Sequence, residues 1–178
     1  MVTAVSKRYA IALFEYAKEK NIVDNVLSEL KDLVDLYKTS DEFKTFIKNP
    51  LIKKSEKEKV IKSMADEGKL SKDLMNFLLI LVEKGRLVLI EEIYNYFRLL
   101  QMEENGEVDA YVKLADEYDD KIKSEIKNSL EKITNKKVNL NIEIDKSILG
   151  GFIAQVKSNL YDVSISGQLR KLKETLLK

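Results

Sequence analysis

The residue types most often used for catalysis and metal binding are scarce in this chain. Its 178 residues include no histidine and no cysteine, which removes the commonest general base, the commonest metal ligand and every thiolate site. A serine or threonine nucleophile would therefore have no histidine to activate it. A serine–lysine pair remains formally possible, but no spacing points to one. The sequence therefore predicts no catalytic residue.

Three acidic pairs and one glycine pair are the remaining candidates for chemistry. Glu91-Glu92, Glu103-Glu104 and Asp119-Asp120 could be imagined as acid/base dyads or as ligands of a hard metal ion. Adjacent helical residues point about 100° apart, however, and all three pairs lie opposite an apolar stripe, which favours solvated surface. Gly150-Gly151 lacks the lysine and hydroxyl of a phosphate-binding loop and is interpreted as a turn between strands. We expect no metal, no cofactor and no small-molecule ligand.

The charge of the chain is almost balanced. Lysine and arginine number 31 against 30 acidic residues, so the net charge of +1 does not indicate a nucleic-acid-binding protein. A local basic cluster could contact phosphate or anionic lipid, but Glu56 and Glu58 dilute it and favour a solvated helix start. Its members are Lys53, Lys54, Lys57, Lys59 and Lys62.

No targeting or membrane-spanning segment is predicted. The longest dense apolar run, residues 74–82, is about half of the roughly 18 residues that a spanning helix needs. The first residues lack the charged and apolar regions of a signal peptide. We therefore expect a soluble, intracellular protein without direct membrane insertion.

Helical periodicity runs through the first 105 residues. Apolar residues recur at helical spacing in six segments joined by short connections, which predicts a six-helix bundle over residues 1–105. Helix boundaries are expected at Ser40, at the capping box Ser55–Glu58, and at Ser71, with Gly85 ending the fifth helix.

After Gly106 the period changes to that of strands. Alternating or continuous apolar runs and one helical pattern predict strand, helix, strand and strand at residues 107–114, 117–134, 138–144 and 152–156. Ser164 can cap a last helix. The order β-α-β-β-α defines a small α+β domain over residues 106–178. The predicted fold class is therefore mainly α, with a six-helix bundle followed by this α+β domain.

Two of the predicted helices are more apolar than a bundle helix needs to be. Six apolar residues run together from Tyr9 to Phe14, and the run 74–82 is interrupted only by Asn76. One interpretation is that both are central helices enclosed by the other four. The second is a groove between them that accepts an amphipathic helix from a partner, because a domain of about 100 residues has too much surface to enclose two helices completely.

Short motifs in order along the whole chain resemble the δ subunit of the rotary ATP synthase, whose mitochondrial counterpart is the oligomycin-sensitivity-conferring protein. They are RYAIALFEYA at 8–17, NPLI at 49–52, EKGRL at 83–87, LGGF at 149–152, and YDVS at 161–164 with GQL at 167–169. The resemblance implies a non-catalytic subunit of the peripheral stalk in a proton- or sodium-driven complex. It also implies a peripheral location at the cytoplasmic face of the bacterial cell membrane.

The same resemblance implies partners and sites. In this family the N-terminal domain sits on the catalytic head and grips N-terminal helices of α subunits, and the C-terminal domain holds the ends of the b-subunit stalk. The α-binding groove lies between the first and fifth helices. Here it maps onto Tyr9, Ala12, Leu13, Tyr16, Phe77, Ile80, Leu81 and Lys84. The stalk is expected on the apolar face of the last helix, at Ile165, Leu169, Leu172 and Leu176.

The sequence departs from the family at one turn. Val163 stands where the family usually has glycine, and Ser166 where it often has arginine. A required glycine would suggest a positive φ, which valine strongly disfavours, so either the turn is rebuilt or the glycine was never needed for its φ.

Two other classes of function stay open at this point. One is a membrane-surface or protein–protein adaptor that uses the basic cluster and a helix-binding groove. The other is a small carboxylate enzyme that uses Mg²⁺.

Overall fold

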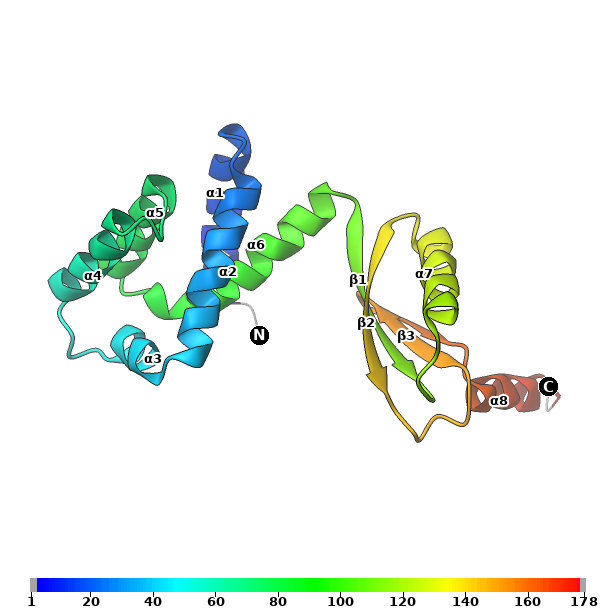
Figure 1. Cartoon of the computed structure of the whole chain (residues 1–178). Coiled ribbons are helices and arrows are strands. Elements are labelled where there is room, and N and C mark those ends of the chain that lie inside the picture. The colour runs from blue at the N-terminus through cyan, green and yellow to red at the C-terminus, as the bar shows by residue number, and fades with distance from the viewer. Residues whose placement is uncertain (1–2, 177–178) are drawn as a thin grey trace. The chain divides into compact units, whose positions relative to one another are not determined.

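The computed structural model describes residues 3–176, without the side chains of residues 171, 175 and 176. The chain divides into two units, Met1–Gln101 and Met102–Lys178. The sequence placed the boundary near residue 105, and the division lies within the last turn of the sixth helix (Figure 1).

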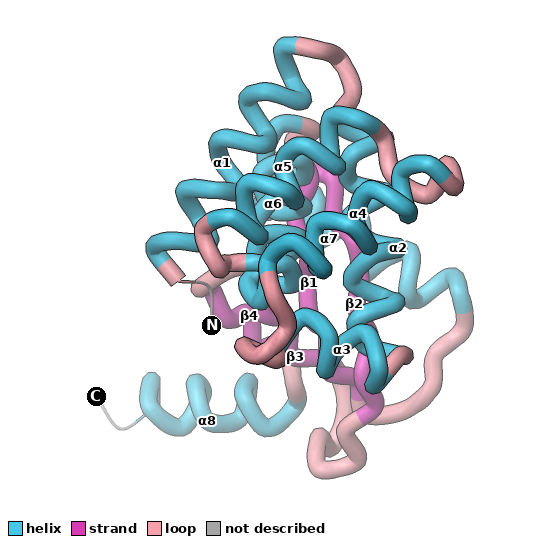
Figure 2. The backbone as a smooth tube through the Cα atoms, turned by 90° about the vertical axis from the view of Figure 1, so that its left-hand side faces the viewer, coloured by secondary structure: helices cyan, strands magenta, loops and turns pink. Residues whose placement is uncertain are grey.

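The first unit is built of helices. They are α1 (Ala4–Glu19), α2 (Val23–Thr39), α3 (Asp41–Lys48), α4 (Lys54–Asp66), α5 (Lys72–Glu83), the short 3-10 helix η1 (Leu87–Leu89) and α6 (Ile90–Glu104). Helix α4 lies beside α5 (Figure 1), and α1 packs against α2; Figure 2 shows the same helices from the side. The core takes side chains from α1, α2, α5 and α6, among them Leu30, Leu78 and Phe97, which are fully buried. Phe14 meets Phe97 edge to face, with ring centroids 5.4 Å apart.

The helix boundaries follow the predicted capping residues at two of three places. The Ser40 hydroxyl accepts a hydrogen bond from the amide of Phe43, and the Ser71 hydroxyl accepts one from the amide of Leu74. The capping box at Ser55 was wrong, because α4 begins one residue earlier, at Lys54, and its N-cap residue makes no side-chain hydrogen bond. A side chain that lies inside the first turn cannot act as the cap.

The second unit holds a four-stranded sheet with one helix on its face (Figure 1). Its elements are β1 (Glu107–Leu114), α7 (Asp120–Thr134), β2 (Lys137–Ile144), β3 (Phe152–Val156), β4 (Asn159–Asp162) and α8 (Ile165–Leu176). The strand order is β2-β1-β3-β4, with β1 and β2 parallel and the other pairs antiparallel. Alternate residues of β1, from Val108 to Leu114, are buried and pack with Ile126 and Leu130 of α7.

The predicted fold class is confirmed: a mainly helical chain with a small α+β domain at its end. The predicted strand count was one short, because β4 follows β3 after a tight turn. Its four residues, NLYD, are too few to show an alternating pattern. Within residues 3–176, no helix combines the length and the apolar character that crossing a bilayer would require.

Candidate functional site

The residues predicted to line a groove between α1 and α5 fall into two groups. Leu13 and Leu81 are 2% and 0% exposed, so they belong to the core and form the floor beneath the surface. The other six reach the surface fully or in part, and we call them the α1–α5 face. They are Tyr9, Ala12, Tyr16, Phe77, Ile80 and Lys84. Ile80 is 48% exposed, although Leu81 next to it is fully buried.

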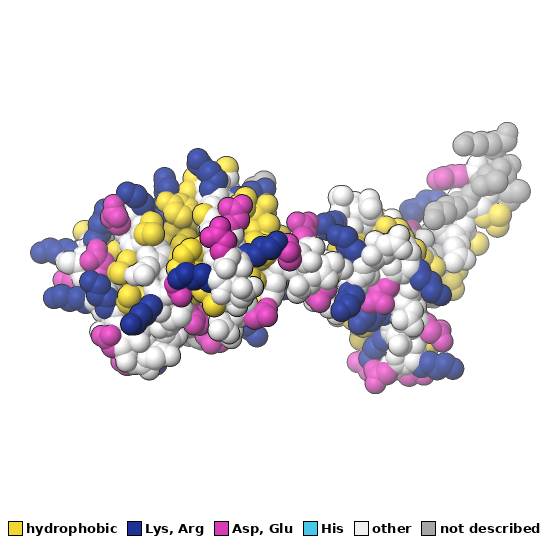
Figure 3. All heavy atoms as spheres, turned by 90° about the horizontal axis from the view of Figure 1, so that it is seen from above, with side chains coloured by type: hydrophobic (Ala, Val, Ile, Leu, Met, Phe, Trp, Pro, Cys, Tyr) yellow, Lys and Arg dark blue, Asp and Glu magenta, His cyan; other side chains and the backbone are white. Residues whose placement is uncertain are grey.

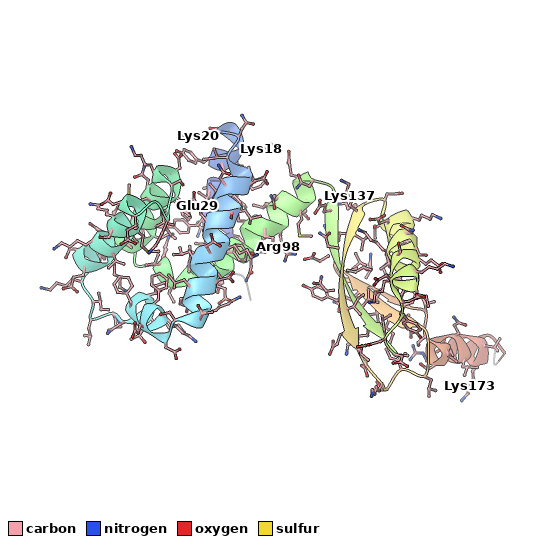
Figure 4. All side chains as sticks on the ribbon, in the orientation of Figure 1. Lys18, Lys20, Glu29, Arg98, Lys137 and Lys173 are labelled. Atoms are coloured by element: carbon pink, nitrogen blue, oxygen red, sulfur yellow. The ribbon has the colours of Figure 1, made fainter. Side chains whose placement is uncertain are left out.

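One end of the α1–α5 face is joined by a small polar network. The Tyr16 hydroxyl donates a hydrogen bond to Asp73 Oδ1, and Lys20 Nζ lies 2.7 Å from the same oxygen. Figure 4 labels Lys20 at the end of α1. The hydrogen bonds from Lys20 and Tyr16 lower the pKa of the Asp73 carboxyl, and Asp73 in turn raises the pKa of Lys20. The start of α5 is thereby tied to the end of α1.

The other end is joined by aromatic and cationic contacts. The rings of Tyr9 and Phe77 meet edge to face with centroids 6.3 Å apart. Arg86, just after α5, donates a hydrogen bond of 2.7 Å to the Tyr9 hydroxyl. Two residues before Arg86, Lys84 Nζ lies 2.8 Å from Glu83 Oε1. This contact raises the pKa of Lys84 and lowers the pKa of Glu83. Long side chains therefore bridge the two helices at both ends of the face. In the middle of α1 the exposed residue Ala12 has only a methyl side chain.

The α1–α5 face suits recognition and offers no machinery for a reaction. Its centre is apolar or small, and its two ends are charged. Figure 3 shows hydrophobic side chains at the surface of the first unit among lysines and acids. Among the residues that the structure describes, no group of three or more histidine, cysteine, aspartate and glutamate side chains could hold a metal ion.

The predicted stalk site lies on α8. Ile165, Leu169 and Leu172 are 49%, 59% and 56% exposed, and they share one face of the helix by their spacing. The side chain of Leu176 lies outside the described residues. In both views α8 extends away from the sheet of its own unit (Figures 1 and 2). Its apolar face is therefore without cover within the described part of the second unit.

A polar cluster at the start of α8 holds the helix in this direction. Ser164 is fully buried, and its hydroxyl accepts a 3.0 Å hydrogen bond from the amide of Gly167, which confirms the predicted cap. Asp162 accepts hydrogen bonds from the amide and hydroxyl of Ser164 and, at 2.9 Å, from Arg170. A Cβ on Gly167 would overlap the Asp162 carboxylate, so glycine is needed here for space.

The turn at Val163 is compatible with valine. Its amide donates to the Phe152 carbonyl at 2.9 Å. Val163 is absent from the described non-glycine residues of positive φ, which are Asn21, Asn135 and Lys157. The positive φ values near this turn lie at Gly150 and Gly151, at +154° and +78°, and the missing Cβ of Gly151 makes room for the Val163 carbonyl. A glycine at position 163 is therefore not required for its φ.

Comparison with known families decides the identity. The family model described as the ATP synthase delta (OSCP) subunit matches residues 5–176. The chain belongs to this family. Members of the delta (OSCP) family are structural subunits of ATP synthase and are not catalytic.

Relatives of the delta family match over the full length. A protein called ATP synthase subunit delta from Clostridium botulinum is 33% identical over 178 residues, which covers 100% of this chain and 99% of the relative. The protein of the same name from Syntrophus aciditrophicus is 33% identical over 174 residues, 98% of this chain and 96% of the relative. A chain in the Toxoplasma gondii mitochondrial ATP synthase hexamer has a similar fold, with a TM-score of 0.74, 22% identity and 99% coverage of both chains.

Several residues of this delta-family chain were missed by sequence reasoning. Arg86 lies inside the EKGRL motif, so its place beside the fifth helix was visible but its contact with Tyr9 was not. Asp73 and Lys20 carried no signal, because their pairing depends on how two helices cross. The Asp162–Gly167 relationship could have been suspected from an aspartate and a glycine five residues apart around a capping serine.

Proposed function

We propose that this chain links the catalytic head of ATP synthase to the peripheral stalk and thereby resists the torque of the rotor. The α1–α5 face receives an N-terminal helix of an α subunit, and α8 contacts the end of the b-subunit stalk. As part of this complex the chain sits at the cytoplasmic face of the bacterial cell membrane, held there by its partners.

The observation that carries the head contact is the exposure of Ile80 on α5, the helix that Tyr16–Asp73 and Tyr9–Phe77 join to α1 at the two ends of the face. An incoming amphipathic helix would cover this apolar centre, while the charged ends of the face would set its direction. Burying about four such anchors gives roughly 8 kcal/mol before association costs, whereas nanomolar binding needs about 12 kcal/mol net. One helix would therefore hold only moderately, and firm attachment needs further contacts.

The exposed apolar face of α8 supports the stalk contact. An isolated helix of about 12 residues is marginal in water, and most helices gain their stability by burying an apolar face. Helix α8 instead presents Leu169 and Leu172 to solvent, while Asp162 and Arg170 hold its start. A partner helix laid along this face would supply the missing cover.

A bridging assay tests the link as a whole. We would immobilise a peptide from the end of the b-subunit stalk. The full chain is then added, followed by the purified catalytic head. We expect the head to be retained only when the chain is present. Leu169→Asp should abolish retention by releasing the stalk peptide, and Ala12→Arg should abolish it by releasing the head. Retention of the head by both variants would contradict the proposed function.

A further inference from the structure

The adjoining parts of α3 and α4, together with the connection between them, combine positive charge with an exposed leucine. Residues 44–62, which we call the α3–α4 corner, contain seven lysines and two glutamates, a net charge of +5. Because the whole chain carries +1, the remaining residues sum to −4. Leu51 at the tip is 87% exposed, the highest value among the exposed large hydrophobic residues of the described chain. Lysine and arginine side chains also gather on the α4 side of the first unit in Figure 3.

The tip of the corner has a defined conformation that does not depend on the side chain of Leu51. The Leu51 amide donates to Asn49 Oδ1 at 2.9 Å, which closes a turn at Pro50. Lys57 Nζ reaches back to the carbonyls of Ile47 and Asn49, at 2.8 and 3.1 Å, and so satisfies the end of α3. A turn held by these hydrogen bonds therefore exposes the Leu51 side chain to solvent.

Several of the surrounding lysines are held in place as well. Lys54 Nζ donates to the Glu83 carbonyl at 2.6 Å, and Lys48 lies 6.0 Å from the centre of the Tyr37 ring. Lys53 and Lys59 are exposed. The ordered lysines therefore help to fix the corner, while Lys53 and Lys59 are accessible to acidic groups of a partner.

We propose that the α3–α4 corner docks on an acidic surface of the catalytic head, where Leu51 fills an apolar pocket and the lysines face its acidic rim. This contact rests on the proposed function for the identity of the partner. It supplies part of the attachment that one helix on the α1–α5 face would lack. The net charge of +5 requires an acidic counterpart, since like charges across an interface oppose association.

A protein pocket suits this corner better than a lipid surface. Membrane-surface helices bury a broad apolar face. On α4 the exposed large hydrophobics amount to Val60 alone, and the rest of its outer side is lysine, glutamate and other polar residues. A single projecting leucine in a segment rich in lysine fits one pocket with an acidic rim.

Binding of the full chain to the purified catalytic head, followed by biolayer interferometry over a series of salt concentrations, tests the proposal. Leu51→Ser should weaken the affinity about tenfold with an unchanged salt dependence, because only apolar burial is lost. The double variant Lys53→Glu, Lys59→Glu should slow association and flatten its dependence on salt. Leu149→Ser and Lys127→Glu make the same kinds of change at exposed sites of the second unit and should leave binding unaltered.

The outcomes separate this proposal from the proposed function. If Ala12→Arg weakens binding while the corner variants behave like their controls, the corner is not a contact and the head-binding role stands. If the wild-type chain does not bind the head, both proposals are overturned. Binding to vesicles that contain phosphatidylserine, lost in Leu51→Ser while head binding is unaffected, would overturn the protein pocket in favour of a lipid surface.

Discussion

Arg86 and Tyr9 join two helices that carry the candidate head-binding face. The Arg86 guanidinium donates a 2.7 Å hydrogen bond to the Tyr9 hydroxyl. The Cζ atom of Arg86 lies 5.4 Å from the centre of the Tyr9 ring. Tyr9 also meets Phe77 of α5 edge to face. The end of α5 is thus fixed to the first half of α1, so the surface offered to a partner is largely formed before binding.

Tyr9→Phe tests this link with little other disturbance. It keeps the ring contacts with Phe77 and Arg86 and removes only the hydroxyl. Because the hydrogen bond is exposed to solvent, we expect a loss of about 1 kcal/mol or less in the free energy of unfolding, measured by urea titration. Tyr9→Ala removes the ring as well and should cost clearly more. Equal losses in the two variants would show that the ring contacts contribute nothing.

Neighbouring positions 80 and 81 should respond in opposite ways to the same change. Ile80→Asp places a carboxylate on a 48% exposed site, so the fold should persist. Leu81→Asp buries a carboxylate without a partner at a 0% exposed site and should unfold the first unit. Circular dichroism on heating separates the two results. Loss of helical signal in Ile80→Asp would show that this side chain belongs to the core, and the α1–α5 face would then be misplaced.

Glu92 should make the first unit sensitive to acid. Hydrogen bonds from the Thr3 amide and the Ser6 hydroxyl hold the pKa of this carboxyl below its ordinary value of 4.5. A carboxyl whose pKa is lowered by folding adds stability above its unfolded pKa, and that contribution is lost as the pH falls through the folded value.

Glu92→Gln measures this contribution directly. Urea unfolding midpoints of wild type and variant should differ at about pH 7 and approach each other as the pH falls below 4.5 and through the lowered pKa of the folded state. Glu91→Gln, at the neighbouring exposed ion pair with Lys38, is the matched control and should change the midpoint little. A gap between wild type and Glu92→Gln that persists in acid would contradict a role for the charged carboxylate.

Gly167→Ala should disturb the start of α8. The new methyl group would overlap the Asp162 carboxylate, which Ser164 and Arg170 hold in place. We expect a loss of about 1–3 kcal/mol in stability, the usual cost of overpacking, read from thermal unfolding. Adding Asp162→Ala should recover part of the loss that the glycine change causes. If Gly167→Ala instead stabilises the protein, as alanine does in an unobstructed helix, the proposed crowding is absent.

The order of the elements could be predicted from the sequence because most of them follow clear periodicity. The alternation over residues 107–114 corresponds to β1, and the capping serines at 40, 71 and 164 begin helices as expected. The strand β4 was missed because four residues after a tight turn carry no usable period. The cap at Ser55 failed because the N-cap residue of α4 is Lys53, two positions earlier, and local signals place helix ends only to within one or two residues.

The sequence named the residues of the candidate site but not which of them are buried. Ala12 and Leu13 are adjacent on a helix, and their side chains diverge by about 100°, so both cannot face the same partner. The structure places Leu13 in the core and leaves Ala12 outside. The bridges made by Asp73 and Arg86 depend on the crossing of two helices far apart in sequence. Local spacing holds no information about such contacts.

Calorimetric titration of the full chain with a synthetic α-subunit N-terminal helix of about 20 residues tests the central claim most directly, since such a helix spans about 30 Å. We predict saturable binding to the wild type and its loss in Ala12→Arg, with the circular dichroism of both proteins unchanged. Absence of binding by the well-folded wild type, or equal binding by Ala12→Arg, would contradict the assignment of the α1–α5 face as the site that holds the catalytic head.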